Sequence, residues 1–113
     1  MIVTATDGVF DNLFNREIQE IVEVFKKERY SLKKQFKCGL RGPPCLLSEP
    51  EEAKELARRI CRAARQKVDD GEAGKKVQTP YQRKLKQTYN EHWDSGKQDD
   101  ITAVVTFVVL ESA

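Results

Sequence analysis

Hydrophobic residues along the chain form two short β-branched runs, one near each end, and two longer helical stripes between them. Residues 2–6 stop at Asp7-Gly8, which predicts a buried strand that ends in a turn. Residues 101–110 are almost continuously apolar, which predicts a long strand covered on both faces. Because domains normally begin in a solvated segment, we expect that sequence before Met1 is missing.

The first helical stripe follows Asn15, which we expect to be the N-cap of a helix that ends near Arg29 or Tyr30. Residues 31–47 contain several Lys, Gly and Pro residues and are predicted to be a loop. Four apolar residues share one face of the helix: Ile18, Ile21, Val22 and Phe25.

The second stripe is the clearest helical signal and follows residues 48–51, which match the S-x-x-E capping box from Ser48 to Glu51. We expect the helix to end at residues 69–71 with Gly71 as its C-cap. Arg59 lies off the apolar face, so we expect it to tolerate replacement. That face includes small residues, which allow close packing against a sheet: Ala53, Leu56, Ala57, Ile60, Cys61, Ala64 and Val68.

The segment from residue 71 to 96 is polar and weakly patterned. Leu85, Tyr89 and Trp93 are spaced four apart and predict a short amphipathic helix, interrupted upstream by Pro80. The single histidine, His92, is expected to be a surface helix residue, because a lone His without a placed partner rarely functions in catalysis.

Composition limits the classes of function. The chain has 113 residues, 39% hydrophobic and 34% charged, which is typical of one globular domain and not of a disordered tail. Its net charge of +2 is too near neutral to indicate nucleic acid, a membrane surface or an acidic substrate. No apolar run approaches the roughly 20 residues that span a bilayer. The basic runs are interpreted as solvated faces: Lys26-Lys27, Lys33-Lys34-Lys37 and Lys75-Lys76 to Lys86.

Three cysteines are present, an odd number without C-x-x-C spacing: Cys38, Cys45 and Cys61. This pattern favours reduced thiols and an intracellular location over a disulfide framework. A zinc site needs more ligands than these scattered residues offer. Cys61 is expected to be buried as a small hydrophobic residue.

Carboxylates flank both predicted strands. Asp7 follows the first, and Asp99 and Asp100 precede the last, so antiparallel pairing of the two strands would bring these residues together. Clustered carboxylates repel one another unless a cation joins them, and hard oxygen ligands suit Mg²⁺ or Mn²⁺. Aspartates at strand ends are also common in turns, so the spacing alone leaves metal binding and turn formation as alternatives.

Two segments carry a family resemblance. Residues 4–13, Thr-Ala-Thr-Asp-Gly-Val-Phe-Asp-Asn-Leu, resemble the "ATDGxWD" motif of the metal-dependent type 2C (PPM) serine/threonine protein phosphatases. Residues 96–105, Gly-Lys-Gln-Asp-Asp-Ile-Thr-Ala-Val-Val, resemble the family's "GKxDDITxVV" motif, and a long amphipathic helix lies between the two. The resemblance implies an α+β fold, the C-terminal portion of a four-layer α/β/β/α sandwich with mainly antiparallel sheets.

The resemblance also implies roles for individual residues. Asp7 and Asp99 would be the two C-terminal carboxylates of a two-metal Mg or Mn centre, with Asp100 beside them. Gly8 would allow a close turn after Asp7, and Asp11 would cap the following helical region. In the family, the metal pair activates a bridging water that attacks the phosphorus of phosphoserine or phosphothreonine.

Two features of the family pattern are missing from this chain. The "DGHGG" motif and the upstream phosphate-binding arginine have no counterpart, so we expect residues 1–113 to be the C-terminal part of a catalytic domain whose N-terminal half is absent. The parent enzyme would act on phosphoproteins, while this chain alone would be inactive. An unpaired sheet edge would favour homo-oligomers or strand exchange.

Two further alternatives stay open. A non-catalytic regulatory or interaction module that retains the scaffold is the second hypothesis for function. Residues 79–81, Thr-Pro-Tyr, resemble the "SPF" of a branch of the family often found in mitochondria. The sequence therefore does not decide between a cytoplasmic and a mitochondrial location.

Overall fold

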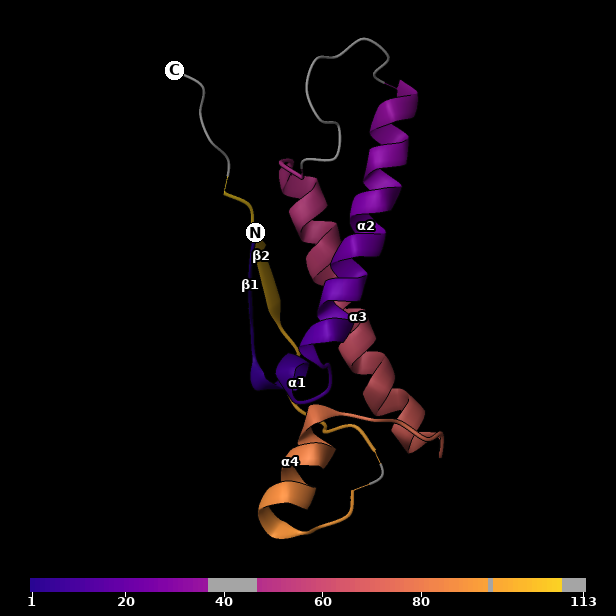
Figure 1. Cartoon of the computed structure of the whole chain (residues 1–113), viewed down its shortest axis with the longest axis vertical. Helices are drawn as coiled ribbons and strands as arrows, with labels where there is room; N and C mark the ends of the chain where they lie inside the picture. The colour runs from indigo at the N-terminus through magenta and orange to yellow at the C-terminus, as the bar shows by residue number, and fades with distance from the viewer. Residues whose placement is uncertain (37–46, 94, 109–113) are drawn as a thin grey trace.

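The computed structural model describes residues 1–36, 47–93 and 95–108 (Figure 1). Cys38, Cys45, Lys37 and most of the loop predicted between the two long helices lie outside these ranges. The chain is an α+β structure with four helices and two strands in the described part, in the order β1 (Ile2–Ala5), α1 (Asp7–Phe10), α2 (Asn15–Phe36), α3 (Pro50–Glu72), α4 (Pro80–Tyr89) and β2 (Ala103–Thr106).

The two strands come from opposite ends of the chain and pair antiparallel, with Val3 opposite Val105 and Ala5 opposite Ala103. These four residues face the core, because strand side chains alternate between the two faces of a sheet. The other face exposes Ile2 and Val104, which are 54% and 55% accessible. The predictions of a buried first strand and of a last strand covered on both faces were therefore wrong. Within the described ranges α3 covers one face only.

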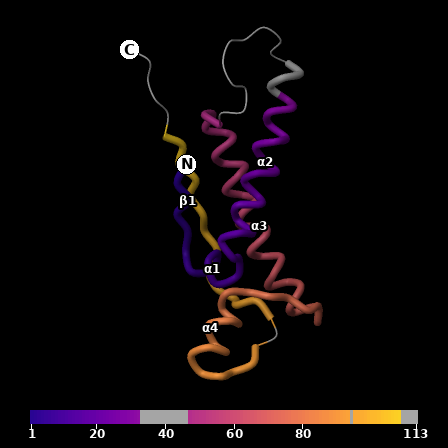
Figure 2. Tube along the Cα trace, viewed as in Figure 1, coloured from indigo at the N-terminus to yellow at the C-terminus, as the bar shows by residue number. Residues whose placement is uncertain are grey.

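Helix α3 provides the surface on which the other elements pack. It contacts β2 and α2, as Figures 1 and 2 show. The predicted apolar face is confirmed, since four of its residues are fully buried: Leu56, Ile60, Ala64 and Val68. Cys61 is only partly buried, because it lines a groove beside β2 and does not enter the centre of the core.

Helix α2 buries the predicted residues Ile18, Val22 and Phe25. Asn15 is its first helical residue, and the N–H of Phe14 donates to Glu17 Oε1 at 2.9 Å, so the cap lies one residue earlier than predicted. The helix also continues to Phe36, beyond the predicted end near Tyr30. Residues 31–36 contain neither Gly nor Pro and are mostly good helix formers, which explains the extension.

The ends of α3 also differ from the prediction. Glu49 is the N-cap and Glu52 Oε1 accepts its N–H at 3.2 Å, so the capping box is shifted by one residue from Ser48. Pro50 favours this arrangement because it suits the first helical position. At the other end the helix passes Gly71 and reaches Glu72.

Helix α4 begins where the sequence predicted an interruption. Thr79 Oγ1 accepts the N–H of Gln82 at 3.2 Å, and Pro80 occupies the first helical position. Trp93 and the exposed His92 lie outside the helix. The rings of Trp93 and Tyr81 pack edge to face, with 6.1 Å between their centroids. In the ranges that the structure describes, no helix has both the length and the apolar character needed to cross a membrane.

Arg59 joins α3 to α2, which the sequence did not predict. Its guanidinium lies 2.7 Å from Glu28 Oε2 and 3.5 Å from Glu55 Oε1, and it covers the ring of Phe25 at 4.9 Å. The hydrogen bond from Arg59 lowers the pKa of Glu28. Because the pKa of Glu28 is lower in the folded state, its ion pair with Arg59 stabilises the fold at neutral pH. This stabilisation is lost as the pH falls through the folded-state pKa of Glu28.

We expect Ile60→Asp to unfold or aggregate the chain, because it places an unpaired charge in the core at a cost of about 3 kcal/mol or more. Arg59→Asp should lower the melting temperature by a smaller amount, since it puts a negative charge beside Glu28 and Glu55. Arg58→Asp is the control, because Arg58 is exposed. Circular-dichroism melts measure all three, and equal melting temperatures would contradict this assignment of the helix face.

Candidate metal centre

The strand pairing places the two predicted carboxylate segments at one end of the sheet. Thr6 fixes this end: its N–H donates to Thr102 O at 3.0 Å and its Oγ1 donates to Asp100 O at 2.8 Å. The same hydroxyl oxygen accepts the N–H of Thr102 at 3.1 Å. Asp7, directly after Thr6, and Asp99 and Asp100 therefore lie at the same end of β1 and β2.

Gly8 allows the backbone after Asp7 to approach the last motif. A Cβ atom at Gly8 would lie 2.3 Å from Asp100 O and 3.1 Å from Ile101 Cγ1. The first distance is shorter than any real contact, and the backbone carbonyl of Asp100 cannot move aside as a flexible side chain could. Only glycine fits this position without displacing residues 100 and 101.

Asn12 connects the same two segments from inside the protein. It is fully buried, and its Nδ2 donates to Gly8 O at 2.7 Å and to Lys97 O at 2.9 Å. Its Oδ1 accepts the N–H of Lys97 at 2.8 Å. Sequence reasoning missed this residue, which directly follows Asp11 and carries no local signal of burial.

Lys97 places a positive charge among the carboxylates. Its Nζ lies 3.0 Å from Asp11 Oδ2, 3.8 Å from Asp99 Oδ2 and 5.0 Å from the centre of the Tyr81 ring. The hydrogen bond to Asp11 raises the pKa of Lys97, so the ammonium group is charged at neutral pH.

These contacts change two points of the sequence analysis. Of the three clustered carboxylates, Asp99 has a basic partner within the chain, because Lys97 pairs with it as well as with Asp11. Asp11 was expected to cap the following helix, but it is the C-cap of α1 and its carboxylate binds Lys97. Its carbonyl accepts the N–H of Tyr81 at 3.0 Å, which attaches α4 to the strand ends.

The donor set suits a hard cation only in part. Asp7, Asp99 and Asp100 are exposed carboxylates, the ligand type that Mg²⁺ and Mn²⁺ prefer, and Asp99 Oδ1 also accepts the N–H of Asp100 at 2.8 Å. Among the described residues, however, no group of three or more His, Cys, Asp or Glu side chains is arranged to hold a metal ion. Water would have to complete the coordination of an ion bound here.

The fold and site define a small α+β unit whose terminal strands pair on a long helix and present carboxylates at one sheet end. The chain is similar to the "Probable protein phosphatase 2C 80" of Arabidopsis thaliana, with 33% identity over 108 residues that cover 96% of the chain. It spans only 20% of that relative. The similarity supports a relationship to the protein phosphatase 2C family. No protein-family model matches the chain. No solved structure matches it either.

We expect Gly8→Ala to destabilise the fold, because the added methyl group would separate the strand ends from Asp100. Gly74→Ala is the control: its φ of 81° strains any other residue by about 1–2 kcal/mol, but an added Cβ meets no atom within 4 Å. Urea unfolding followed by circular dichroism compares the two. The close approach at Gly8 would be contradicted if Gly8→Ala cost less stability than Gly74→Ala.

Proposed function

We propose that residues 1–113 are the C-terminal part of a type 2C (PPM) phosphatase domain, and that the whole domain hydrolyses phosphoserine and phosphothreonine in proteins. The observation that carries this proposal is the antiparallel pairing of β1 and β2, which puts Asp7 and Asp99 at the same sheet end. The similarity to a phosphatase over nearly the whole chain supports it. The parent's phosphoprotein substrates follow from the same proposal.

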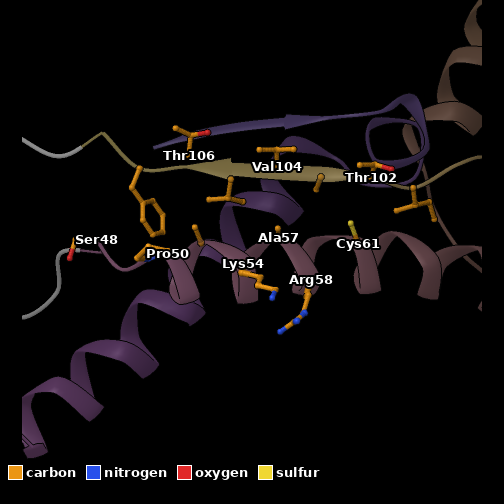
Figure 3. Close-up of a pocket in the computed structure, with 14 residues that line it drawn as sticks. Ser48, Pro50, Lys54, Ala57, Arg58, Cys61, Thr102, Val104 and Thr106 are labelled. Carbon is orange, nitrogen blue, oxygen red and sulfur yellow. The ribbon is translucent and has the colours of Figure 1, made fainter.

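Two surfaces support a larger sandwich around this unit. The outer sheet face exposes Ile2 and Val104, which a second sheet would cover in an α/β/β/α arrangement. The free edge of β2 borders a groove of about 790 Å³, with α3 on its other side (Figure 3). Further strands could pair with this edge, because β1 occupies only the opposite one.

In this proposal Asp7 and Asp99 each supply carboxylate oxygen to a metal centre, with Asp100 beside them. Bound Mg²⁺ or Mn²⁺ would supply an activated water for attack on the phosphorus. The chain's own contribution is positional: Thr6 and Gly8 hold Asp7 against the segment of Asp99. Since the described residues provide an incomplete ligand set, we infer that this chain alone is inactive.

A non-catalytic interaction module is the second candidate, and the contact between Lys97 and Asp99 favours it. An ammonium group beside a carboxylate offsets its negative charge, so a metal cation at that position neutralises less repulsion between the carboxylates. A scaffold that has lost its chemistry would be stable with this internal cation alone.

We expect no appreciable hydrolysis of p-nitrophenyl phosphate by the chain in the presence of Mn²⁺. The carboxylates of Asp7 and Asp99 alone supply too few ligands to hold two metal ions, so the nucleophilic water would not be positioned. Release of p-nitrophenol measures this directly. Clear metal-dependent turnover that is lost in Asp99→Asn would show a more complete active site than proposed.

Binding of Mn²⁺ separates the two candidate functions. We expect a weak site with an affinity near the millimolar range, about 4 kcal/mol, because water must supply most ligands. Asp7→Asn should abolish it, while Lys97→Met should strengthen it by roughly threefold to tenfold by removing a competing cation. Asp70→Asn, at the end of α3, is the control and should have no effect.

Paramagnetic broadening of amide signals during a Mn²⁺ titration locates the ion. Broadening centred on residues 7 and 99 supports the metal centre. No broadening in the chain or in Lys97→Met favours the non-catalytic module. Broadening centred on residues 69–71 would place the ion elsewhere and contradict the proposed site.

A further inference from the structure

A basic cavity lies between the C-terminal end of α3, α4 and the segment that follows α4, and the carboxylates of the candidate metal centre do not line it. Figure 1 shows where these elements lie. Its volume is about 830 Å³, within the roughly 300–1,000 Å³ of typical ligand sites. Four basic side chains line it against one acidic residue, Glu91: Lys75, Lys76, Arg83 and Lys86.

The charge is concentrated here by the local sequence. Residues 73–90 contain five basic residues and no acidic one, although the chain as a whole carries a net charge of only +2. Lys75 Nζ lies 3.6 Å from Asp70 Oδ1, and Arg83 covers the ring of Phe14 at 4.9 Å. In the described part of the chain, Lys76 and Lys86 have no ion-pair partner, so both ammonium groups can bind an anion.

Backbone and side-chain contacts hold the walls of the cavity in place. The N–H of Tyr81 donates to Asp11 O at 3.0 Å, and Gln82 Nε2 donates to Ser95 O at 3.1 Å. The reciprocal bonds between Thr79 and Gln82 fix the start of α4. A site whose walls are fixed before binding loses less entropy when a ligand binds.

We propose that this cavity binds an anionic peptide segment of a partner protein. Lys76 and Lys86 hold its carboxylate or phosphate groups, and Trp93, which lines the cavity and is 46% exposed, contacts an apolar side chain. The proposal goes beyond the phosphatase assignment and does not depend on it, since it requires neither a metal ion nor Asp7.

A peptide fits the site better than a nucleic acid. Single-stranded nucleic acids require a basic groove along the backbone together with aromatic faces for the bases. Here the basic side chains surround one cavity, and two guanidinium groups, those of Arg16 and Arg83, already lie over the Phe14 ring. A short acidic segment needs only the two lysines and the exposed part of Trp93.

The test uses the whole chain and three labelled peptides of equal length, each with one leucine at the same position: oligoglutamate, the same peptide with phosphoserine in place of one glutamate, and oligoglutamine. Fluorescence anisotropy at physiological ionic strength gives the affinities. Trp93 is the single tryptophan of the chain, so a change in its emission reports occupancy of this cavity. We expect both acidic peptides to bind and to change the emission, and the neutral peptide to do neither. Tighter binding of the phosphoserine peptide assigns the main contact to phosphate, and equal binding assigns it to carboxylates.

Two double variants separate a defined site from diffuse attraction. Lys76→Gln with Lys86→Gln should weaken peptide binding about tenfold. Lys27→Gln with Lys84→Gln removes the same total charge from exposed residues outside the cavity, Lys84 lying on the same helix, and should change affinity less than about twofold. Circular dichroism confirms that each variant is folded. The proposal is overturned if no acidic peptide binds, if both double variants weaken binding equally, or if a labelled single-stranded oligonucleotide of equal charge binds more tightly.

Discussion

The structure depends on the antiparallel contact between the two ends of the chain. β1 and β2 are about 100 residues apart in sequence, so their pairing closes a long loop at a substantial entropic cost. Thr6, Gly8 and Asn12 stabilise the closure, through the hydroxyl bonds to Asp100 and Thr102, the close backbone approach and the buried amide. Thr6 and Gly8 flank Asp7 in the chain and Asn12 binds the carbonyl of Gly8, so these residues also set the geometry of the candidate metal centre.

Helix α3 stabilises the strand pairing by burying the apolar side chains on one face of β1 and β2. Its large residues, Leu56 and Ile60, fill the core, while the small residues Ala53 and Ala57 allow β2 to lie close. The same helix holds α2 through Arg59, whose charge pairs with Glu28 while its guanidinium covers Phe25. An apolar stripe and one charged residue beside it thus connect the sheet and both long helices.

The sequence predicted elements whose signal is local and missed those that depend on distant residues. Helical stripes containing Phe25 and Ile60 were correctly predicted because buried positions repeat with the helix period. Helix ends were displaced because neighbouring caps compete, as Glu49 does with Ser48. The burial of both strands was overestimated, because an apolar run in the sequence does not reveal which other elements cover it. The bonds of Asn12 to residue 97 could not be predicted, because they join positions 85 residues apart.

The net charge of the chain does not describe its local regions. The total is only +2, yet the fold separates acidic strand ends from a basic cavity. Lys97 and Asp11 lie between the two regions: their side chains pair at the strand ends, and Asp11 O also binds the N–H of Tyr81 on α4. Opposite charges in a folded chain cancel in the sum but act locally, because screening in physiological salt limits their reach to about 8 Å. The proposed cation site at the strand ends and the proposed anion site beside α4 therefore each depend on local charge and not on the sum.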